Sequence, residues 1–181
     1  NMRITTGKYR NRKLHMPRGI RPTQDKVRKA VFDILGDIEG LTFLELFAGS
    51  GAVGFEALSR GAAKLVLVES KRDSILAIKR NIELLNAANC ELFHLEAEKA
   101  IKLLSLDKKS FEIIFIDPPY LKDMGKKILQ TLEAYDILSP YGFIVVQHSR
   151  LEQLPKDSLK FDLIKEAKYG DTWLSIFKQK Q

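Results

Sequence analysis

Residues 42–54 read TFLELFAGSGAVG, an apolar run followed at once by three glycines in the pattern G-x-G-x-x-G, namely Gly49, Gly51 and Gly54. The run is typical of a buried strand, and glycines there let the chain turn tightly and let a ligand lie against bare backbone. Glu69 ends the next apolar run about 20 residues on, where an acid holds a ribose hydroxyl in nucleotide-binding folds. The stretch predicts a nucleotide-type ligand; a tight turn without a ligand is the alternative.

Apolar strands and helical segments alternate along the rest of the chain. Strand-like runs occupy 42–47, 64–69, 90–95, 111–117 and 142–148, and helix-like spacing covers about 23–36, 70–86, 97–104 and 122–135. This order predicts a parallel sheet covered on both faces. Two runs around the turn signal at 168–172 predict a terminal antiparallel hairpin, and 2–5 could pair with 13–16 as a short hairpin.

The positive charge is gathered near the N-terminal end. The 181 residues carry a formal net charge of +7, with 30 Lys and Arg against 23 Asp and Glu. Residues 1–30 hold ten of the basic residues against Asp25 alone, which leaves 20 basic and 22 acidic residues for the rest. The asymmetry indicates a nucleic-acid-binding element joined to a nearly neutral body. A solvated basic segment is the alternative.

Composition excludes several other classes of protein. Cys90 is the only cysteine, so neither a disulfide framework nor a thiolate metal cluster is expected, and a reducing cytoplasm fits best. The three histidines show no metal-ligand spacing. No apolar run approaches the ~18–20 residues that cross a bilayer. The N-terminus lacks the apolar core of a secretory signal.

The residue before the glycine loop bears on which nucleotide is bound. NAD and S-adenosylmethionine both suit a G-x-G-x-x-G turn, but Glu45 could pair with the ammonium of S-adenosylmethionine, and NAD has no cation there. A terminal antiparallel strand is also usual in S-adenosylmethionine-dependent methyltransferases. The sequence therefore favours that cofactor, while an NAD-binding oxidoreductase stays open. Glu45 could instead cap the glycine turn.

The stretch IDPPY (116–120) follows the fourth core strand, where open α/β sheets bind ligands. Pro118 and Pro119 fix φ and remove two N–H donors, so the turn is rigid and presents carbonyls. Tyr120 offers a face for a flipped-out base, worth ~1–3 kcal/mol. Hydrogen bonds from a base amine to Asp117 and the Pro118 carbonyl would orient its lone pair toward a sulfonium methyl. The alternative is a structural turn in which Asp117 caps a helix starting at Pro119.

The pattern [DN]-P-P-[YFW] is the motif of amino-methyltransferases that act on adenine N6, guanine N2, cytosine N4 or glutamine. More narrowly, the chain resembles the RsmD-like family, whose enzyme methylates guanine N2 in 16S ribosomal RNA and is usually named for guanine 966. The resemblance covers nearly the whole chain. It rests on the pattern RPTxDxVRxAxF (21–32), on LELFAGSGAVGFEALSRGA (44–62), on Glu69, on DPPY (117–120) and on YGDT (169–172).

The resemblance implies roles for particular residues. The cofactor would be held by Glu45, Phe47, Gly49, Gly51, Glu69, Glu96 and Ala97, with Glu69 on the ribose hydroxyls and Glu96-Ala97 at the adenine. The target guanine would be positioned by Asp117, Pro118, Pro119 and Tyr120. RNA would be bound by Arg10, Arg12, Lys13, Arg21, Arg28 and Tyr169, although the last three could instead pair with acids or pack in the hairpin. Two departures are Gln147 and Glu96, where relatives often have Glu and Asp.

These patterns together predict an α/β, Rossmann-like S-adenosylmethionine-dependent methyltransferase fold. The expected sheet is mostly parallel and seven-stranded, with an antiparallel terminal hairpin. Residues 1–20 would form a small basic RNA-binding hairpin and 21–181 the methyltransferase domain. The expected substrate is guanine N2 of 16S rRNA, free or in the 30S subunit, for a monomer without metal or membrane. Adenine-N6 methylation of DNA or RNA is an alternative, although no second domain is evident to read a DNA sequence. A non-catalytic rRNA-binding factor is another.

Overall fold

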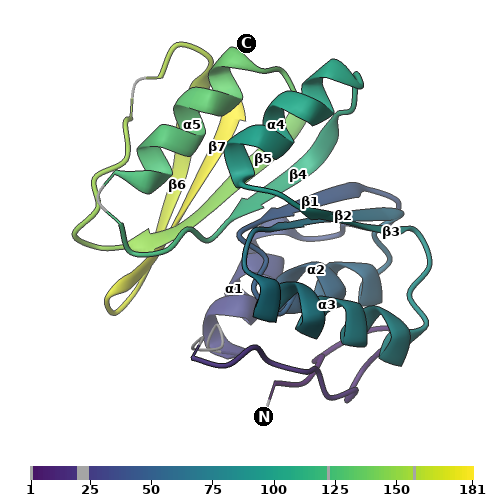
Figure 1. The fold of residues 1–181 in the computed structure, drawn as a ribbon. Coiled ribbons are helices and arrows are strands. Elements are labelled where there is room, and N and C mark those ends of the chain that lie inside the picture. Colours follow the sequence, from purple (N-terminus) through teal and green to yellow (C-terminus); the bar gives the residue numbers. More distant parts are fainter. Residues whose placement is uncertain (1, 20–24, 122, 157) are drawn as a thin grey trace.

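A single seven-stranded sheet runs through the molecule, with helices on both faces (Figure 1). The computed structural model describes residues 2–19, 25–121, 123–156 and 158–181. The strand order is β3-β2-β1-β4-β5-β7-β6. The strands are β1 (Thr42–Leu46), β2 (Lys64–Glu69), β3 (Cys90–His94), β4 (Phe111–Ile116), β5 (Leu138–Ser149), β6 (Phe161–Tyr169) and β7 (Thr172–Gln179). Strands β1 to β5 pair in parallel, and β7 is antiparallel to β5 and β6. The predicted fold class is confirmed.

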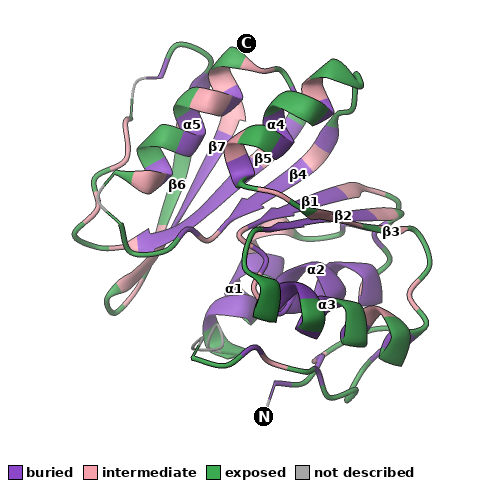
Figure 2. Ribbon diagram, viewed as in Figure 1, coloured by how far each residue is buried: buried purple, intermediate pink, exposed green. Residues whose placement is uncertain are grey.

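The helices form one layer on each face of the sheet. Helices α1 (Asp25–Leu35), α2 (Ala52–Ser59) and α3 (Arg72–Leu85) cover one face, and α4 (Ala97–Leu106) and α5 (Met124–Ala134) cover the other (Figure 1). Each face has its own cluster of buried apolar residues, and the central strands between the clusters are mostly buried, whereas the edge strands β3 and β6 are largely exposed or half-buried (Figure 2). Successive residues of β1 alternate between the clusters: Phe43 lies under α1–α3 and Leu44 under α4 and α5.

The strand order reverses between β1 and β4. From β1 the chain moves outward through β2 to β3, and α4 then carries it back to β4 on the other side of β1. The helices that follow β1 and β4 consequently lie on opposite faces, so the two loops diverge. Open α/β sheets bind ligands in the crevice formed at such a point. The glycine loop and Asp117 both leave the sheet here.

Element boundaries differ from the sequence prediction in two places. The strand expected at 142–148 begins earlier, because Leu138 already pairs with Phe111 before an irregularity in the β4–β5 register. The helix expected over 122–135 begins at Met124, while residue 122 lies outside the described residues. The terminal hairpin forms as predicted, with Gly170 at a φ of 61° in its turn. Among the helices the structure describes, none combines the length and apolar character needed to span a membrane.

The N-terminal segment folds back on itself, but through less pairing than predicted. Instead of two strands at 2–5 and 13–16, Arg3 and Lys13 form one isolated antiparallel bridge. Backbone hydrogen bonds still join the two arms, from the Leu14 N–H to the Met2 carbonyl at 2.9 Å and from the Asn11 N–H to the Ile4 carbonyl at 2.8 Å. Packing also holds the segment in place, since Met2, Ile4, Tyr9 and Leu14 are buried in the same apolar cluster as α1 and α2.

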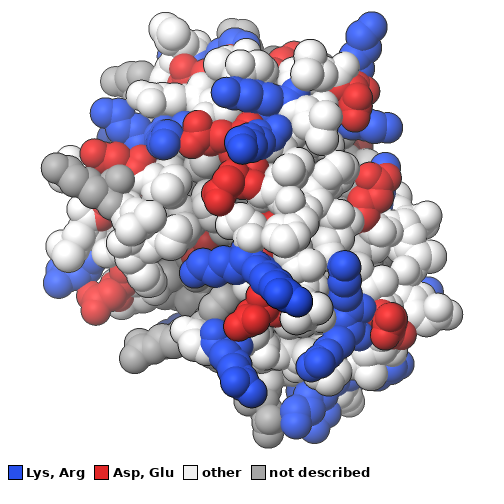
Figure 3. Space-filling view, in the orientation of Figure 1, with Lys and Arg blue, Asp and Glu red and all other residues white. Residues whose placement is uncertain are grey.

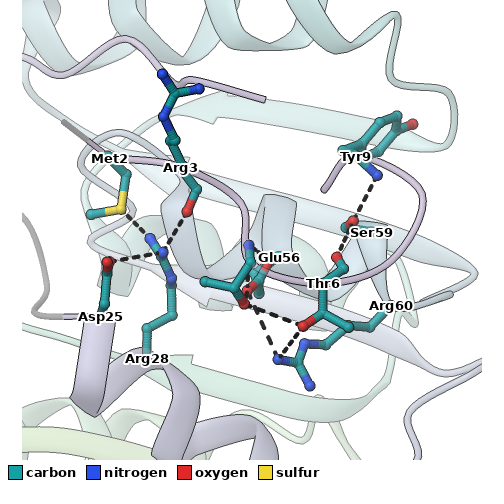
Figure 4. A network of polar contacts seen from close by, with 10 residues as sticks. Met2, Arg3, Thr6, Tyr9, Asp25, Arg28, Glu56, Ser59 and Arg60 are labelled. Atoms are coloured by element: carbon teal, nitrogen blue, oxygen red, sulfur yellow. Dashed lines mark hydrogen bonds and ion pairs between the residues drawn. The ribbon is translucent and has the colours of Figure 1, made fainter. Parts of the chain in front are cut away.

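Hydrogen bonds to α2 anchor the same segment (Figure 4). Ser59 Oγ donates to the carbonyl of Thr6 at 2.6 Å and accepts the Tyr9 N–H at 2.8 Å. The buried carboxylate of Glu56 accepts the Thr5 N–H at 3.1 Å. With the segment on one side and the sheet on the other, every residue of α2 is buried.

Candidate functional site

The glycine loop has a backbone fixed by its sequence. Phe47, the first residue after β1, has a φ of 56°, a left-handed conformation that bulky residues rarely adopt. Such strained residues persist mainly at functional sites. A Cβ on Gly54 would lie 2.7 Å from a methyl carbon of Leu65 and 3.0 Å from Glu45 Oε1, so only glycine lets α2 pack this closely on the sheet. The loop is therefore held close to both neighbouring strands.

Glu69 ties the glycine loop to the end of β2. Its Oε1 accepts the N–H of Gly49 at 2.9 Å, and its Oε2 accepts the N–H groups of Ser70 and Lys71, both at 2.8 Å. A carboxylate has about four lone-pair sites, so these three bonds leave capacity for a ligand hydroxyl. The buried Glu69 thus fixes the loop and can still accept from a ribose.

A small cleft lies beside Glu69. Its lining combines apolar side chains with one carboxylate, and consists of Phe47, Val68, Glu69, Ser70, Leu95 and Ala97. The open volume is about 10 Å³, so the cleft as it stands marks one edge of a site and does not enclose a nucleoside. Apolar side chains next to a strand-end acid are the chemistry expected at the edge of an adenosine site. Three predicted residues meet here, whereas Glu96 is exposed and outside the lining. Sequence reasoning missed Ser70 and Leu95; the available signal was that each adjoins a predicted residue.

Glu45 and Asp117 place two further carboxyls near Glu69. Glu45 is buried, and its Oε1 accepts the Gly54 N–H at 3.1 Å, the contact expected of a turn cap. Burial raises the pKa of Glu45 well above its usual value. The hydrogen bond from Gly54 lowers this pKa, and the negative charges of Asp117 and Glu69 raise it further. Burial also raises the pKa of Asp117 to about 7.

Crowded carboxyls with raised pKa values favour a positively charged ligand, which would let them ionise. Within the described ranges, no group of three or more His, Cys, Asp and Glu side chains could hold a metal ion. A ligand with an ammonium or sulfonium group beside an adenosine carries the positive charge that these carboxyls favour.

The DPPY stretch lies at the end of β4, and its residues are exposed to different degrees. Pro118 is buried and Asp117 partly exposed, while Pro119 is exposed and Tyr120 is 81% exposed. The aromatic ring is thus available for stacking. The alternative in which Asp117 caps a helix starting at Pro119 is wrong, because α5 begins only at Met124.

The basic residues expected to bind RNA fall into different settings. Arg10, Arg12 and Lys13 are exposed, and the Arg12 guanidinium donates to the Leu84 carbonyl at the end of α3. Arg21 lies outside the described residues. Tyr169 is half-buried and packs against the apolar cluster under α1–α3, the hairpin packing weighed as its alternative.

Arg28, which was expected to bind RNA, is buried inside the protein. Only 1% of it is exposed, and its guanidinium donates to the Arg3 carbonyl at 2.5 Å and pairs with Asp25 Oδ1 at 3.0 Å (Figure 4). A side chain held inside the protein in this way does not reach RNA phosphates. The structure instead shows the alternative, in which Arg28 pairs with an acid.

Asn81 joins the basic segment to the glycine loop and was not predicted. Its Oδ1 accepts the His15 N–H at 2.7 Å, and its Nδ2 donates to the carbonyls of His15 and Ser50, both at 3.0 Å. The side chain is fully buried. In the sequence it is one polar residue within a helix, and nothing there indicates contacts with residues 31 and 66 positions away.

Known proteins resemble the chain over its whole length. The family model described as Conserved hypothetical protein 95 matches residues 2–178. YlbH of Bacillus subtilis is 33% identical over 99% of this chain and 100% of its own. The Ribosomal RNA small subunit methyltransferase D of Escherichia coli K12 is 32% identical over 98% of this chain and 90% of its own.

Solved structures share the fold. A hypothetical protein of Thermus thermophilus matches with a TM-score of 0.86 at 31% identity, over 98% of this chain and 99% of its own. A 16S rRNA N2 G1207 methyltransferase of T. thermophilus, solved with AdoMet and guanosine, matches with a TM-score of 0.70 over 91% of this chain and 44% of its own; at 21% identity it shows the fold alone. From its sequence matches, the chain belongs to the Conserved hypothetical protein 95 family, the RsmD-like family that its motifs resemble.

Proposed function

We propose that the protein transfers a methyl group from S-adenosylmethionine to the exocyclic N2 of a guanine in 16S ribosomal RNA, with guanine 966 as the expected target. The observation that carries the proposal is the placement of Asp117 and an exposed Tyr120 at the switch point, beside Glu45 and the cleft at Glu69. The relative named Ribosomal RNA small subunit methyltransferase D supports the RNA substrate. Such a substrate implies work in the cytoplasm, and a monomer suffices for the site.

The residues of the site fit the cofactor. Glu69 would accept the ribose hydroxyls, Phe47 and Ala97 would flank the adenine, and Glu45 would pair with the ammonium group. When bound, S-adenosylmethionine supplies an electrophilic methyl group on a positively charged sulfur. Gly49 and Gly51 would let the cofactor lie against the loop, while Glu96 would reach the adenine only from outside the cleft.

The residues after β4 would position the base. The Asp117 carboxylate and the Pro118 carbonyl would accept the two N–H groups of guanine N2, directing the nitrogen lone pair toward the methyl carbon. Pro119 would hold the turn rigid and Tyr120 would stack on the base. As nitrogen bonds to carbon, positive charge develops on nitrogen and is stabilised by Asp117. With its pKa near 7, Asp117 can also accept the proton that nitrogen loses.

A basic surface extends from the N-terminal segment onto α3. Lys and Arg side chains gather over this part of the molecule (Figure 3). Arg10, Arg12 and Lys13 of the segment are exposed, as are Lys71, Arg72, Lys79 and Arg80 around α3, and Arg12 contacts the end of α3 at the Leu84 carbonyl. A hollow of about 320 Å³ lies between residues 15–18 and α3, and is lined by His15, Met16, Pro17, Arg18, Asp73, Leu76, Ala77 and Arg80. Its two arginines could meet RNA phosphates and its apolar side chains a base, while Asp73 is the one acid in the lining.

Salt dependence tests this surface. Replacing Arg10 and Arg12 together with Ala should reduce the slope of log affinity against log salt by roughly 1.5, since each lost phosphate contact removes about 0.7–0.9. The measurement is a filter-binding titration on 16S rRNA at several salt concentrations. Lys99→Ala on α4, exposed on the opposite layer, is the control. An unchanged slope in the double variant would remove the segment from the RNA-binding model.

The raised pKa of Asp117 predicts opposite effects of pH on activity and stability. Because the carboxylate is the active form, kcat/KM should rise with pH and level off above about pH 7. Below the ordinary value of 3.8 both folded and unfolded states are protonated. Between 3.8 and about 7 only the folded state keeps the proton on Asp117, so the unfolded state becomes more favourable as pH rises. The stability that Asp117 contributes is therefore lost as pH rises through about 7. Asp117→Asn should flatten both profiles; a rate step that persists in this variant would belong to another group.

The deciding experiment is transfer of labelled methyl to unmodified 16S rRNA and to 30S subunits, followed by nucleoside analysis. N2-methylguanosine is the expected product. N6-methyladenosine as the product would mean that the same site methylates adenine instead of guanine. Binding of RNA and S-adenosylhomocysteine without transfer to either substrate would favour a non-catalytic factor. Stabilisation by NAD instead of S-adenosylhomocysteine in a thermal-shift titration would favour the oxidoreductase.

A further inference from the structure

Gln147 lies beside Asp117 at the carboxyl end of the sheet. β4 and β5 pair in parallel with Phe115 opposite Val145 and Ile116 opposite Val146, so Asp117 and Gln147 follow as the next neighbours. Phe115 and Val145 both belong to the cluster under α1–α3. Side chains two residues apart share a face of the sheet. Asp117 and Gln147 therefore project to the same face, on adjacent strands.

The amide of Gln147 has an unmet hydrogen-bonding need. The residue is 8% exposed, and among the described residues its buried Oε1 has no hydrogen-bond partner. An unpaired buried acceptor is costly, and nearly all such atoms in folded proteins are paired. The next residue, His148, lies on the other face and is paired at both ring nitrogens, with Ser175 Oγ at 2.7 Å and the Ser149 carbonyl at 2.9 Å. His148 is thus hydrogen-bonded at both ring nitrogens, whereas the side-chain oxygen of Gln147 has no partner in the described part of the chain.

We propose that Gln147 reads the target base, its Oε1 accepting the N1–H of guanine while Asp117 accepts an N2–H. Guanine presents N1–H and N2–H₂ side by side on its Watson–Crick edge. Oε1 of Gln147 is buried in the free protein, so a turn of the side-chain amide would bring it beside the Asp117 carboxylate as the second acceptor. Strands about 4.8 Å apart and a side chain one methylene longer than Asp let both reach one base. Adenine would offer a lone pair at N1, which Oε1 repels. This contact deepens the guanine-N2 function proposed above and rests on it.

The test compares guanine with 2-aminopurine at the target position of a 16S rRNA substrate, because 2-aminopurine keeps the exocyclic amine and lacks the N1–H. Gln147→Met, similar in size but without the amide, should lower kcat/KM on guanine by about 10-fold, the effect of leaving one buried donor unpaired. Transfer to 2-aminopurine should change much less, so discrimination falls by nearly the same factor. Gln179→Met is the matched control: it loses an amide that donates to the Leu138 carbonyl at 2.9 Å, away from the site, and should keep wild-type discrimination.

RNA affinity, measured with S-adenosylhomocysteine present, supplies a second readout on the same two substrates. It reports the base contact even if the wild type binds RNA without methylating it, so failure of the proposed function and failure of this contact are told apart. A smaller affinity gap between guanine and 2-aminopurine in Gln147→Met supports the contact. An equal loss on both substrates, or none, would make Gln147 a structural residue and overturn the proposal.

Discussion

Asp117→Ala is expected to lower methyl transfer by about 10³-fold, the scale seen when a preorganised group that stabilises transition-state charge is removed. Cofactor affinity should stay within a few-fold, because Asp117 faces the target amine and Glu45 and Glu69 hold the cofactor. Asp117→Asn should fall between Ala and wild type, since its amide oxygen still accepts one hydrogen bond but carries no charge. The measurement is single-turnover transfer of labelled methyl to unmodified 30S subunits.

The control for this variant is Asp136→Ala, which removes an exposed acid outside the site. Its rate should match the wild type. Isothermal titration with S-adenosylhomocysteine shows whether the Asp117 variants keep a folded cofactor site. Near wild-type transfer by a well-folded Asp117→Ala protein would mean that the DPPY turn does not position the reacting amine.

Glu45→Gln should weaken binding of S-adenosylmethionine by about 100-fold, because truncating one charge of a buried pair costs roughly 2–5 kcal/mol. The free protein holds Glu45 with a raised pKa, so binding of a cation should ionise it and release protons. Affinity should accordingly increase with pH in the wild type. In the variant this proton release should shrink to the share contributed by Asp117. Calorimetry in buffers of different ionisation enthalpy measures both quantities.

Glu83→Gln, an exposed acid on α3, provides the same substitution outside the site and should leave affinity unchanged. S-adenosylhomocysteine keeps the ammonium and loses the sulfonium, so Glu45→Gln should weaken it too. A variant that binds both ligands as the wild type does would restrict Glu45 to its bond with the Gly54 N–H, the turn-capping role.

Local pattern was sufficient to predict the sheet and the strand ends that meet at its centre. The apolar runs ending at Leu46, Glu69 and Ile116 could be read as strands, and a parallel sheet brings their carboxyl ends together whatever the rest of the chain does. Glu69 and Ala97 consequently meet in one cleft. Leu46 and Ile116 adjoin the glycine loop and the DPPY stretch, whose backbone requirements are visible in the sequence.

What could not be predicted depends on contacts between distant residues. Arg28 looked like one of several RNA-binding arginines, and only the packing of the first residues over α1 buries it. Asn81 and Gln147 are single polar residues in apolar elements, and their significance depends on which neighbour each meets or lacks. The N-terminal segment folds back with hydrogen bonds between its arms as expected, but a single bridge between Arg3 and Lys13 takes the place of two strands. The division into an RNA-binding segment and a methyltransferase domain stays a prediction.

The N-terminal segment differs from the rest of the chain in its proposed role but does not fold separately, because Met2, Ile4, Tyr9 and Leu14 are part of the shared core. Cutting the segment away would uncover the apolar cluster that these four residues complete, and would remove the hydrogen bonds that the segment makes with Glu56 and Ser59 of α2. The segment and the sheet should melt together in one cooperative transition. A deletion mutant would therefore confuse lost stability with lost RNA affinity, and the RNA-binding surface has to be dissected by exchanging exposed side chains.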